Sequence, residues 1–189
     1  GLFDAATVPF YWKELEPERG KPRYFAGAAE DPAYWKTHGK GDVAWRRPAP
    51  EKVLDFCDAN GVSVHGHVLI YPWPQPDWVN SVTNLEERMA MYEAHIAEIA
   101  ALYRDRVPQW DVVNESVDRS CSMAGPYHDK VVWGRPNHLV PDDYTFRCHK
   151  WAEEAFPASV KFEMNDSWRP FYPPFVQSII DRGAKVDVV

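Results

Sequence analysis

The sequence lacks the features that mark membrane proteins, disulfide scaffolds and nucleotide-binding sheets. No uncharged apolar run approaches the roughly 18 residues that a membrane span needs. No Gly-rich loop follows an expected strand, so the sequence shows no phosphate cradle of a nucleotide-binding fold. The three cysteines, Cys57, Cys121 and Cys148, are widely spaced and form no Cys-x-x-Cys pair, which argues against a disulfide framework and against a zinc module.

Positive charge is also scarce. The 189 residues contain 21 Lys and Arg against 28 Asp and Glu, so the formal net charge is −7, and no basic cluster is present. We therefore expect neither nucleic acid nor a membrane surface as a partner. Hydrophobic residues (45%) and charged residues (26%) are close to globular averages, which excludes a disordered chain and a coiled coil.

Proline and aromatic residues are present in excess. The chain has 17 Pro, and Trp, Tyr and Phe number 9 each. This combination is typical of a loop-rich face on a rigid scaffold, and flat aromatic faces suit flat ligands such as sugar rings. The Pro-rich segments 72–76 and 169–174 each follow an expected strand, which is where α/β proteins place their ligand loops.

Hydrophobic periodicity predicts alternating helices and strands. This alternation indicates a parallel sheet with crossover helices, and both an open doubly wound sheet and a (β/α)8 barrel fit it. Polar residues at the strand ends and the lack of a Gly-rich loop favour the barrel. Because the chain is shorter than the about 200 residues of the smallest usual barrels, we expect an incomplete barrel with five or six strands. The expected helices cover 51–60, 85–104, 143–156 and 175–182, and the expected strands cover 2–7, 62–71, 109–114, 160–165 and 186–189.

The sharpest candidate for chemistry is the run Trp110–Glu115, which ends a buried strand in an amide and a carboxyl. A carboxyl held there suits a general acid; a Glu that merely stabilises a helix N-terminus is the alternative. His65 and His67 lie two residues apart and share one face of the strand 62–71. They either bind a metal, hydrogen-bond a substrate or simply pack against neighbours.

Two further groups of candidate residues follow strands. The loop Tyr71–Trp78 offers three large rings on a proline-stiffened segment, which suits stacking on pyranose rings and equally suits ordinary loop packing. Asn165 and Asp166 end the strand 160–165, where they either face a ligand or form a turn. All these groups stand at successive strand ends, the arrangement of an active site at the rim of a barrel.

Taken in order, these motifs resemble the family-10 glycoside hydrolases, the (β/α)8 endo-β-1,4-xylanase type. Trp110–Glu115 is identical to the strand-four motif of that family, and Val64–Ile70 is similar to its strand-three Gly-His-Thr-Leu motif. Pro76–Val79 matches its Pro-x-Trp turn, and Asn165-Asp166 is similar to its strand-five Asn-Asp. The resemblance implies that residues 1–189 are an incomplete family-10 catalytic domain, α/β in class, with about strands two to six of the barrel present.

The resemblance also implies an activity and a set of site residues. It implies a retaining endo-β-1,4-glycanase that hydrolyses plant cell-wall xylan or a related β-1,4-glycan and that uses no metal or other cofactor. Glu115 would protonate the leaving glycosidic oxygen and then activate water. Asn114 would hold the 2-hydroxyl of the sugar, and His67 would bind the same sugar. The implied substrate-binding residues are His67, Asn114, Tyr71, Trp73 and Asn165.

A retaining enzyme needs a second carboxylate about 5–5.5 Å from the acid/base, as nucleophile. The family carries it on strand seven, whereas this chain is expected to end at strand six, so we expect the nucleophile beyond Val189. The sequence begins without an initiator Met and contains no signal peptide, and we expect both ends to be cut. We therefore expect a fragment that is inactive alone and marginally stable, because its sheet edges are open. Secretion or a periplasmic location is expected from the family.

The sequence departs from the family pattern around the −2 sugar. Thr7–Trp12 stands where family members carry Glu-Asn-Glu-Met-Lys-Trp, and Tyr71 and Pro72 stand in place of Trp and His. We expect a shifted specificity, because polar pockets reject unmatched ligands far better than apolar ones do. Two alternatives stay open: a catalytically silent sugar-binding barrel relative, and a metal-dependent barrel hydrolase that uses His65 and His67.

Overall fold

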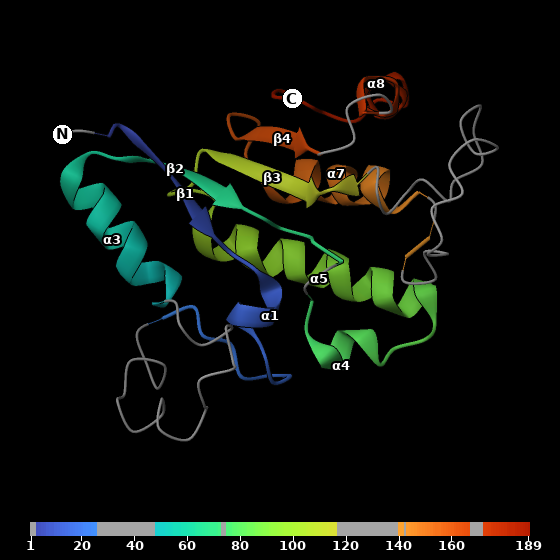
Figure 1. Ribbon diagram of the computed structural model, residues 1–189, viewed down its shortest axis with the longest axis horizontal. Coiled ribbons are helices and arrows are strands. Elements are labelled where there is room, and N and C mark those ends of the chain that lie inside the picture. The colour runs from blue at the N-terminus through green and yellow to red at the C-terminus, as the bar shows by residue number, and fades with distance from the viewer. Residues whose placement is uncertain (1–2, 26–47, 73–74, 117–139, 142, 167–171) are drawn as a thin grey trace.

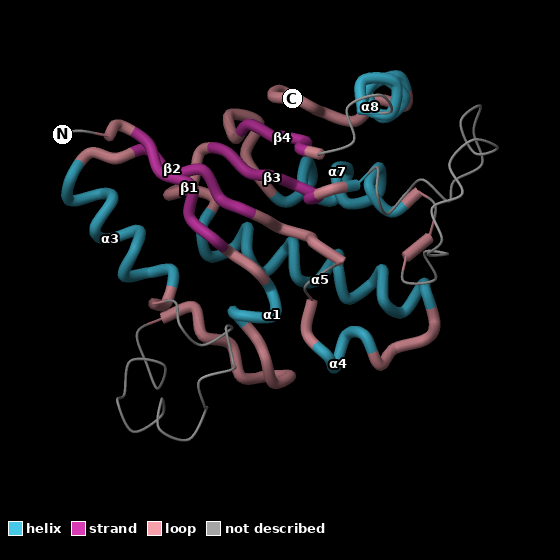
Figure 2. Tube along the Cα trace, viewed as in Figure 1, coloured by secondary structure: helices cyan, strands magenta, loops and turns pink. Residues whose placement is uncertain are grey.

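The computed structural model describes residues 3–25, 48–72, 75–116, 140–141, 143–166 and 172–189. Strands and helices alternate along the chain, as Figures 1 and 2 show. In this part of the chain no helix combines the length and the apolar content that a membrane crossing requires. The elements are β1 (Ala5–Pro9), α1 (Trp12–Leu15), α3 (Pro50–Asn60), β2 (Ser63–His67), α4 (Asp77–Asn80), α5 (Leu85–Tyr103), β3 (Gln109–Asn114), α7 (Tyr144–Ala155), β4 (Lys161–Asn165) and α8 (Tyr172–Asp181).

Capping residues mark the start of α5 and both ends of α3. The side chain of Asn84 caps α5 by accepting hydrogen bonds from the backbone N–H groups of Glu86 (3.0 Å) and Glu87 (3.1 Å). Helix α3 has Pro50 in its first turn, where the missing N–H costs nothing, and ends at Gly61 in a left-handed conformation (φ 64°). The expected helices 51–60, 85–104 and 143–156 are thus confirmed to within one or two residues.

The four strands form one parallel sheet in the order β1-β2-β3-β4, which is also their order along the chain. Figure 1 shows the strands pointing in one direction, with their carboxyl ends at a common edge. Helices α3, α5 and α7 contribute to the main apolar core together with the strands, and α5 packs on α7. Parallel neighbours in chain order, each joined by a helical crossover, are the wall of an α/β barrel.

Side chains alternate between the two faces of this sheet. Trp110 of β3 is fully buried on the helical side, where Phe10 and Phe156 pack against its ring. Gly66 of β2 is the register partner of Trp110, and a Cβ added at Gly66 would meet the indole ring at 2.3 Å. The other face is polar and carries interacting side chains from all four strands: Thr7, His65, His67, Asp111, Glu163 and Asn165.

Some expected elements differ from the structure. The strand 62–71 is shorter than expected: β2 ends at His67, the His67–Val68 peptide bond is cis, and Ile70 joins Val113 through an isolated bridge. The expected strand 2–7 is shifted, since β1 covers Ala5–Pro9. The expected strand 186–189 is reduced to one parallel bridge, between Glu163 and Val188.

The Pro-rich segment 169–174 was expected to be a loop, but its last three residues belong to α8. Helix α8 begins at Tyr172, three residues before the expected start of 175. Pro173 and Pro174 therefore lie in the first helical turn, where the backbone N–H groups have no helical partner to lose. The buried side of α8 packs with β4, since Val176 and Ile179 form an apolar cluster with Met164.

Candidate active site at the carboxyl edge of the sheet

Glu115 directly follows β3 and lies at the carboxyl edge of the sheet. Its backbone is left-handed (φ 51°), a conformation that is uncommon for a residue other than Gly. Its backbone N–H donates to the carbonyl oxygen of Asn165 at 3.2 Å, which ties the end of β3 to the end of β4. Its carboxylate Oε2 accepts a hydrogen bond from the Tyr71 hydroxyl. The structure thus brings together three of the expected site residues.

Asp111 lies in β3, four residues before Glu115. It contacts His65, His67 and Asn165 at the centre of the polar face. Only 2% of its surface is exposed. Its Oδ2 lies 2.5 Å from Nδ1 of His67, and its Oδ1 accepts a hydrogen bond from the Asn165 amide at 2.7 Å. Burial raises the pKa of this carboxyl, but its contacts with two histidines and with Asn165 outweigh burial and lower the pKa to about 2. Asp111 is therefore ionised at neutral pH.

His65 lies between two carboxylates on the same face. Its Nε2 is 3.1 Å from Oδ2 of Asp111 and 3.6 Å from Oε2 of Glu163, and Thr7 Oγ1 is 3.5 Å from its Nδ1. The contact with Asp111 raises the pKa of His65 above its usual value; burial acts in the opposite direction, and the charge of Glu163 adds to the rise. Gln109 donates a hydrogen bond to Oε2 of Glu163 at 2.6 Å.

The donor atoms of His65, Asp111 and Glu163 lie within 4.8 Å of one another, a spacing that a metal ion could occupy. This grouping differs from the expected pair of His65 and His67. The two histidines do share one face of β2, but Nδ1 of His67 is engaged by Asp111.

Tyr11 belongs to the same edge, although sequence reasoning did not select it. Its ring meets the His67 ring edge-on at a centroid distance of 5.4 Å, and the Tyr71 ring at 6.4 Å. The available signal was the aromatic run at 10–12, where the resemblance predicts sugar-binding residues. Asn114 is 6% exposed, and its backbone N–H donates to Ile70. Trp73 lies outside the described residues.

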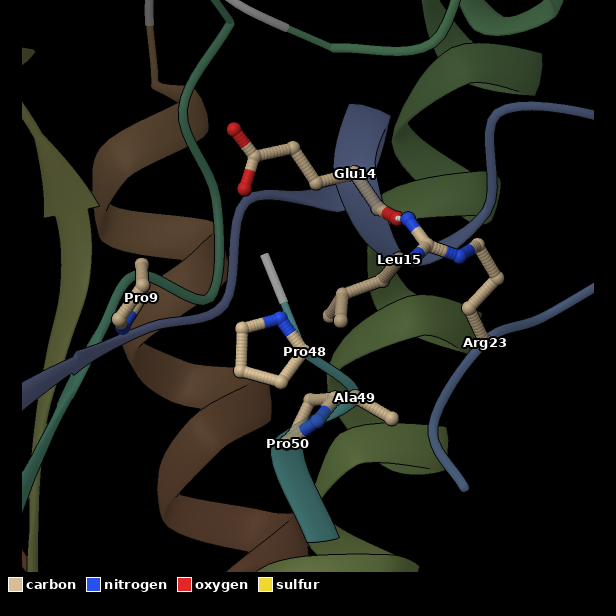
Figure 3. Close-up of a pocket in the computed structure, with 7 residues that line it drawn as sticks. All are labelled: Pro9, Glu14, Leu15, Arg23, Pro48, Ala49 and Pro50. Atoms are coloured by element: carbon tan, nitrogen blue, oxygen red, sulfur yellow. Dashed lines mark hydrogen bonds between the residues drawn. The ribbon is translucent and has the colours of Figure 1, made fainter. Parts of the chain in front are cut away.

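A small pocket lies beside the carboxyl end of β1, between α1 and the start of α3 (Figure 3). Arg23 closes one side by donating a hydrogen bond to the carbonyl oxygen of Glu14 at 3.0 Å. Three prolines line this pocket, and one of them, Pro9, is the register partner of His67. The lining residues are Pro9, Glu14, Leu15, Arg23, Pro48, Ala49 and Pro50.

The consecutive parallel strands and the polar groups at their carboxyl ends define an α/β protein built as part of a (β/α)8 barrel. The chain belongs to glycosyl hydrolase family 10, whose family model matches residues 12–187. It is 37% identical over 137 residues to a beta-1,4-xylanase of Dictyoglomus thermophilum, covering 70% of this chain and 36% of that protein. It is 27% identical over 148 residues to endo-1,4-beta-xylanase B of Paenibacillus barcinonensis, covering 73% of this chain and 43% of that protein.

The fold is similar to that of xylanase 10B from Thermotoga petrophila in complex with xylobiose. The TM-score is 0.68 at 22% identity, and the match covers 96% of this chain and 50% of that one. The chain therefore spans about half or less of the length of these relatives. The expected fold class, an α/β partial barrel, and the expected family are confirmed.

Proposed function

We propose that residues 1–189 form part of the catalytic domain of a retaining endo-β-1,4-glycanase of the xylanase type, with Glu115 as general acid/base. The observation that carries this proposal is the placement of Glu115: it follows β3 at the carboxyl edge, and Tyr71 holds its carboxylate by a hydrogen bond. In the first step Glu115 would give its proton to the leaving glycosidic oxygen. In the second step the same carboxylate would take a proton from the attacking water.

The nucleophile of this reaction, we propose, is not among the described residues. It must be a second carboxylate about 5–5.5 Å from the acid/base. On the polar face, Asp111 is buried and occupied by His67 and Asn165, and Glu163 accepts from Gln109. Neither carboxylate is available to attack a sugar.

The substrate-binding groups are assigned to the same edge of the sheet. His67 and Asn165 are held by Asp111, and the Tyr11 ring contacts the rings of His67 and Tyr71. We propose that these groups, with Asn114 and Trp73, bind xylose units of xylan or of a related β-1,4-glycan. The names of the relatives, which are xylanases, support this substrate. Because such a polymer lies outside the cell, we infer that the protein acts there.

The acid/base role is tested in a protein that carries both carboxylates. Glu115→Ala should lower turnover of xylan, a substrate with a poor leaving group, by about 10²–10⁴-fold. Turnover of an aryl xyloside with a good leaving group should fall much less, and added azide should restore it with formation of a β-xylosyl azide. Glu93→Gln, on the exposed side of α5, is the control and should change neither rate.

Equal losses on both substrates, without rescue by azide, would contradict an acid/base role for Glu115. Binding of xylo-oligosaccharides without turnover by the unmodified protein would instead support a sugar-binding relative.

A metal-dependent hydrolase is the second candidate function, because His65, Asp111 and Glu163 present donor atoms within 4.8 Å of one another. Loss of activity on chelation and its recovery with a divalent cation would support this candidate. Full activity after chelation would eliminate it, and the azide experiment would be unaffected.

A further inference from the structure

Tyr71 is held at the carboxyl edge by the backbone that precedes it. Two hydrogen bonds tie Ile70 to β3: its N–H donates to the carbonyl oxygen of Val112 at 3.0 Å, and its own carbonyl oxygen accepts from the N–H of Asn114 at 3.1 Å. Tyr71 is the next residue along the chain, just as Glu115 is the residue that follows β3. The two side chains therefore start from backbone segments that are bonded to each other.

The Tyr71 hydroxyl donates a hydrogen bond to Oε2 of Glu115. A carboxylate can only accept, so the phenol supplies the proton of this bond. The backbone of Glu115 is held from the other side, because its N–H donates to the carbonyl oxygen of Asn165 at 3.2 Å. Strand β4 thus holds the backbone of Glu115, and the segment after β2 holds one of its two carboxylate oxygens.

The hydroxyl contact is a different role from that of the Tyr71 ring. The ring lies 6.4 Å from the Tyr11 ring, between centroids, and at this edge it suits contact with a sugar. The hydroxyl instead touches the proposed acid/base. The family pattern has Trp at position 71, and Trp has no hydroxyl, so this contact is a feature of the present chain.

We propose that Tyr71 is a positioning residue for the acid/base: by holding Oε2 of Glu115, it leaves Oε1 as the oxygen that gives and takes the catalytic proton. This role rests on the proposed function of Glu115, whereas the hydrogen bond itself does not. In the first step the Oε1 proton goes to the glycosidic oxygen as the bond from that oxygen to the anomeric carbon breaks. In the second step Oε1 takes a proton from water as the water oxygen bonds to the anomeric carbon and the nucleophilic carboxylate leaves.

Positioning matters because a glutamate side chain has three rotatable bonds and can otherwise place its carboxyl in several orientations. A catalytic group that is misplaced by about 1 Å can lose about 10²-fold in rate. One oxygen fixed by the phenol orients the other, and the phenol keeps its own proton through both steps. Loss of the hydroxyl should therefore weaken proton transfer and leave sugar binding nearly unchanged.

Kinetics on a series of aryl β-xylobiosides tests this role in a protein that carries both carboxylates. Tyr71→Phe removes the hydroxyl and keeps the ring. Its kcat/KM should fall by about 10²-fold for the poorest phenol leaving group, with the loss in kcat rather than in KM. The best leaving group departs without a proton, so its kcat/KM should barely change. A plot of log kcat/KM against leaving-group acidity should thus become steeper.

Tyr103→Phe is the matched control. Tyr103 ends α5, which leads into the start of β3, and its hydroxyl lies 3.4 Å from the carbonyl oxygen of Tyr24, away from the carboxyl edge. This variant should change neither the slope nor the rates. An equal loss on every leaving group in Tyr71→Phe would assign Tyr71 to sugar contact alone and overturn the proposal, as would an unchanged slope.

The hydrogen bond is tested separately from the reaction. In denaturant unfolding, Tyr71→Phe and Glu115→Ala together should cost less than the sum of the two single losses, because each removes the same bond. Strictly additive losses would overturn the proposal. A crystal structure of the unmodified protein with xylobiose should show the Tyr71 hydroxyl still on Oε2 of Glu115, and a hydroxyl that has moved away would also overturn it.

Failure of the proposed function has its own signature. If Glu115→Ala lost activity equally on all leaving groups, Glu115 would not be the acid/base, and the assignment of Oε1 would fall with it. If Glu115→Ala behaved as an acid/base variant while Tyr71→Phe kept the slope of the unmodified protein, the role of Tyr71 alone would be wrong.

Discussion

Glu115 combines an unfavourable backbone with a well-held side chain. Its φ of 51° places an L-residue in the left-handed region, which costs roughly 1–2 kcal/mol. The same backbone conformation aims the carboxylate at the Tyr71 hydroxyl and the N–H at Asn165. Strain of this kind is typical of residues that are kept for function.

From the left-handed backbone of Glu115 we predict how substitutions at this position change the free energy of unfolding. Glu115→Gly should unfold with a free energy about 1 kcal/mol larger than that of Glu115→Ala, because Gly alone adopts a positive φ without steric penalty. Denaturant unfolding of the two variants measures the difference. The same pair of substitutions at Glu93, exposed within α5, is the control and should show the opposite order, since Ala favours helix over Gly by about 1 kcal/mol. A more stable Ala variant at position 115 would contradict the backbone argument.

At the scale of single residues the sequence pointed to candidate site residues but not to their contacts. The strand-four motif pointed to Glu115 and Asn114, but it gave no sign that Asp111 would join His67 and Asn165. These partners are 44 and 54 residues away from Asp111. Whether they meet depends on strand register, and the pairing of β3 with β4 shifts between Asp111 and Val113. Such a shift has no local sequence signature.

Strands β2 and β3 pack closely because a glycine of β2 lies opposite a tryptophan of β3. Gly66 lies opposite Trp110, and the indole ring occupies the space that a side chain at position 66 would need. Trp110 is fully buried against Phe10 and Phe156, so the ring has little room to move away. The glycine between the two histidines of β2 is therefore a packing requirement.

Gly66→Ala should lower the free energy of unfolding by about 1–3 kcal/mol, the usual cost of overpacking a rigid core. Trp110→Phe should be destabilising alone because it leaves a cavity. In the double variant the smaller ring accommodates the new methyl group, so the combined loss should be smaller than the sum of the two single losses. Strictly additive losses in denaturant unfolding would show that the Gly66–Trp110 contact is not the cause.

The elements themselves were predictable where side-chain period and capping decide them. The step pattern of Met89, Tyr92 and Ile96 predicted α5, and all three are fully buried. Prediction failed where pairing with another strand decides the ends. The apolar run 62–71 continues past His67 without a change in composition, yet the strand ends there. The start of α8 was missed because two prolines can begin a helix as readily as they can form a loop.

At the scale of the whole molecule, two buried histidines contribute to the loss of stability in acid. His95 stacks on Trp12 at a centroid distance of 4.0 Å, and burial lowers its pKa to about 3. Burial also lowers the pKa of His149 to about 4, although the hydrogen bond between its Nδ1 and the Lys185 carbonyl oxygen acts to raise this pKa. Both values lie below the unfolded value of about 6.5, so the stabilisation is complete above about pH 6.5 and is lost as the pH falls. His65, whose pKa is raised, acts in the opposite direction and loses its contribution as the pH rises.

The free energy of unfolding should therefore be greatest near neutral pH. On the acid side it should fall with a slope that corresponds to an uptake of nearly two protons on unfolding. His95→Phe keeps an aromatic ring on Trp12 but cannot bind a proton, so it should reduce that slope by about one proton. His65→Gln, the matched control, should leave the acid slope in place and flatten the alkaline side. Denaturant unfolding at a series of pH values measures both, and an unchanged acid slope in His95→Phe would contradict the assignment.

The agreement between strand order and chain order bears on how the protein is made. Each strand pairs with the one synthesised just before it, and the helices between them pack into the same apolar core as the strands. During translation, every β-α unit can thus dock onto a sheet that has already emerged from the ribosome, without waiting for a distant segment. Among these four strands the sheet grows from β1 towards β4, and Glu115 reaches the carboxyl edge as soon as β3 has docked.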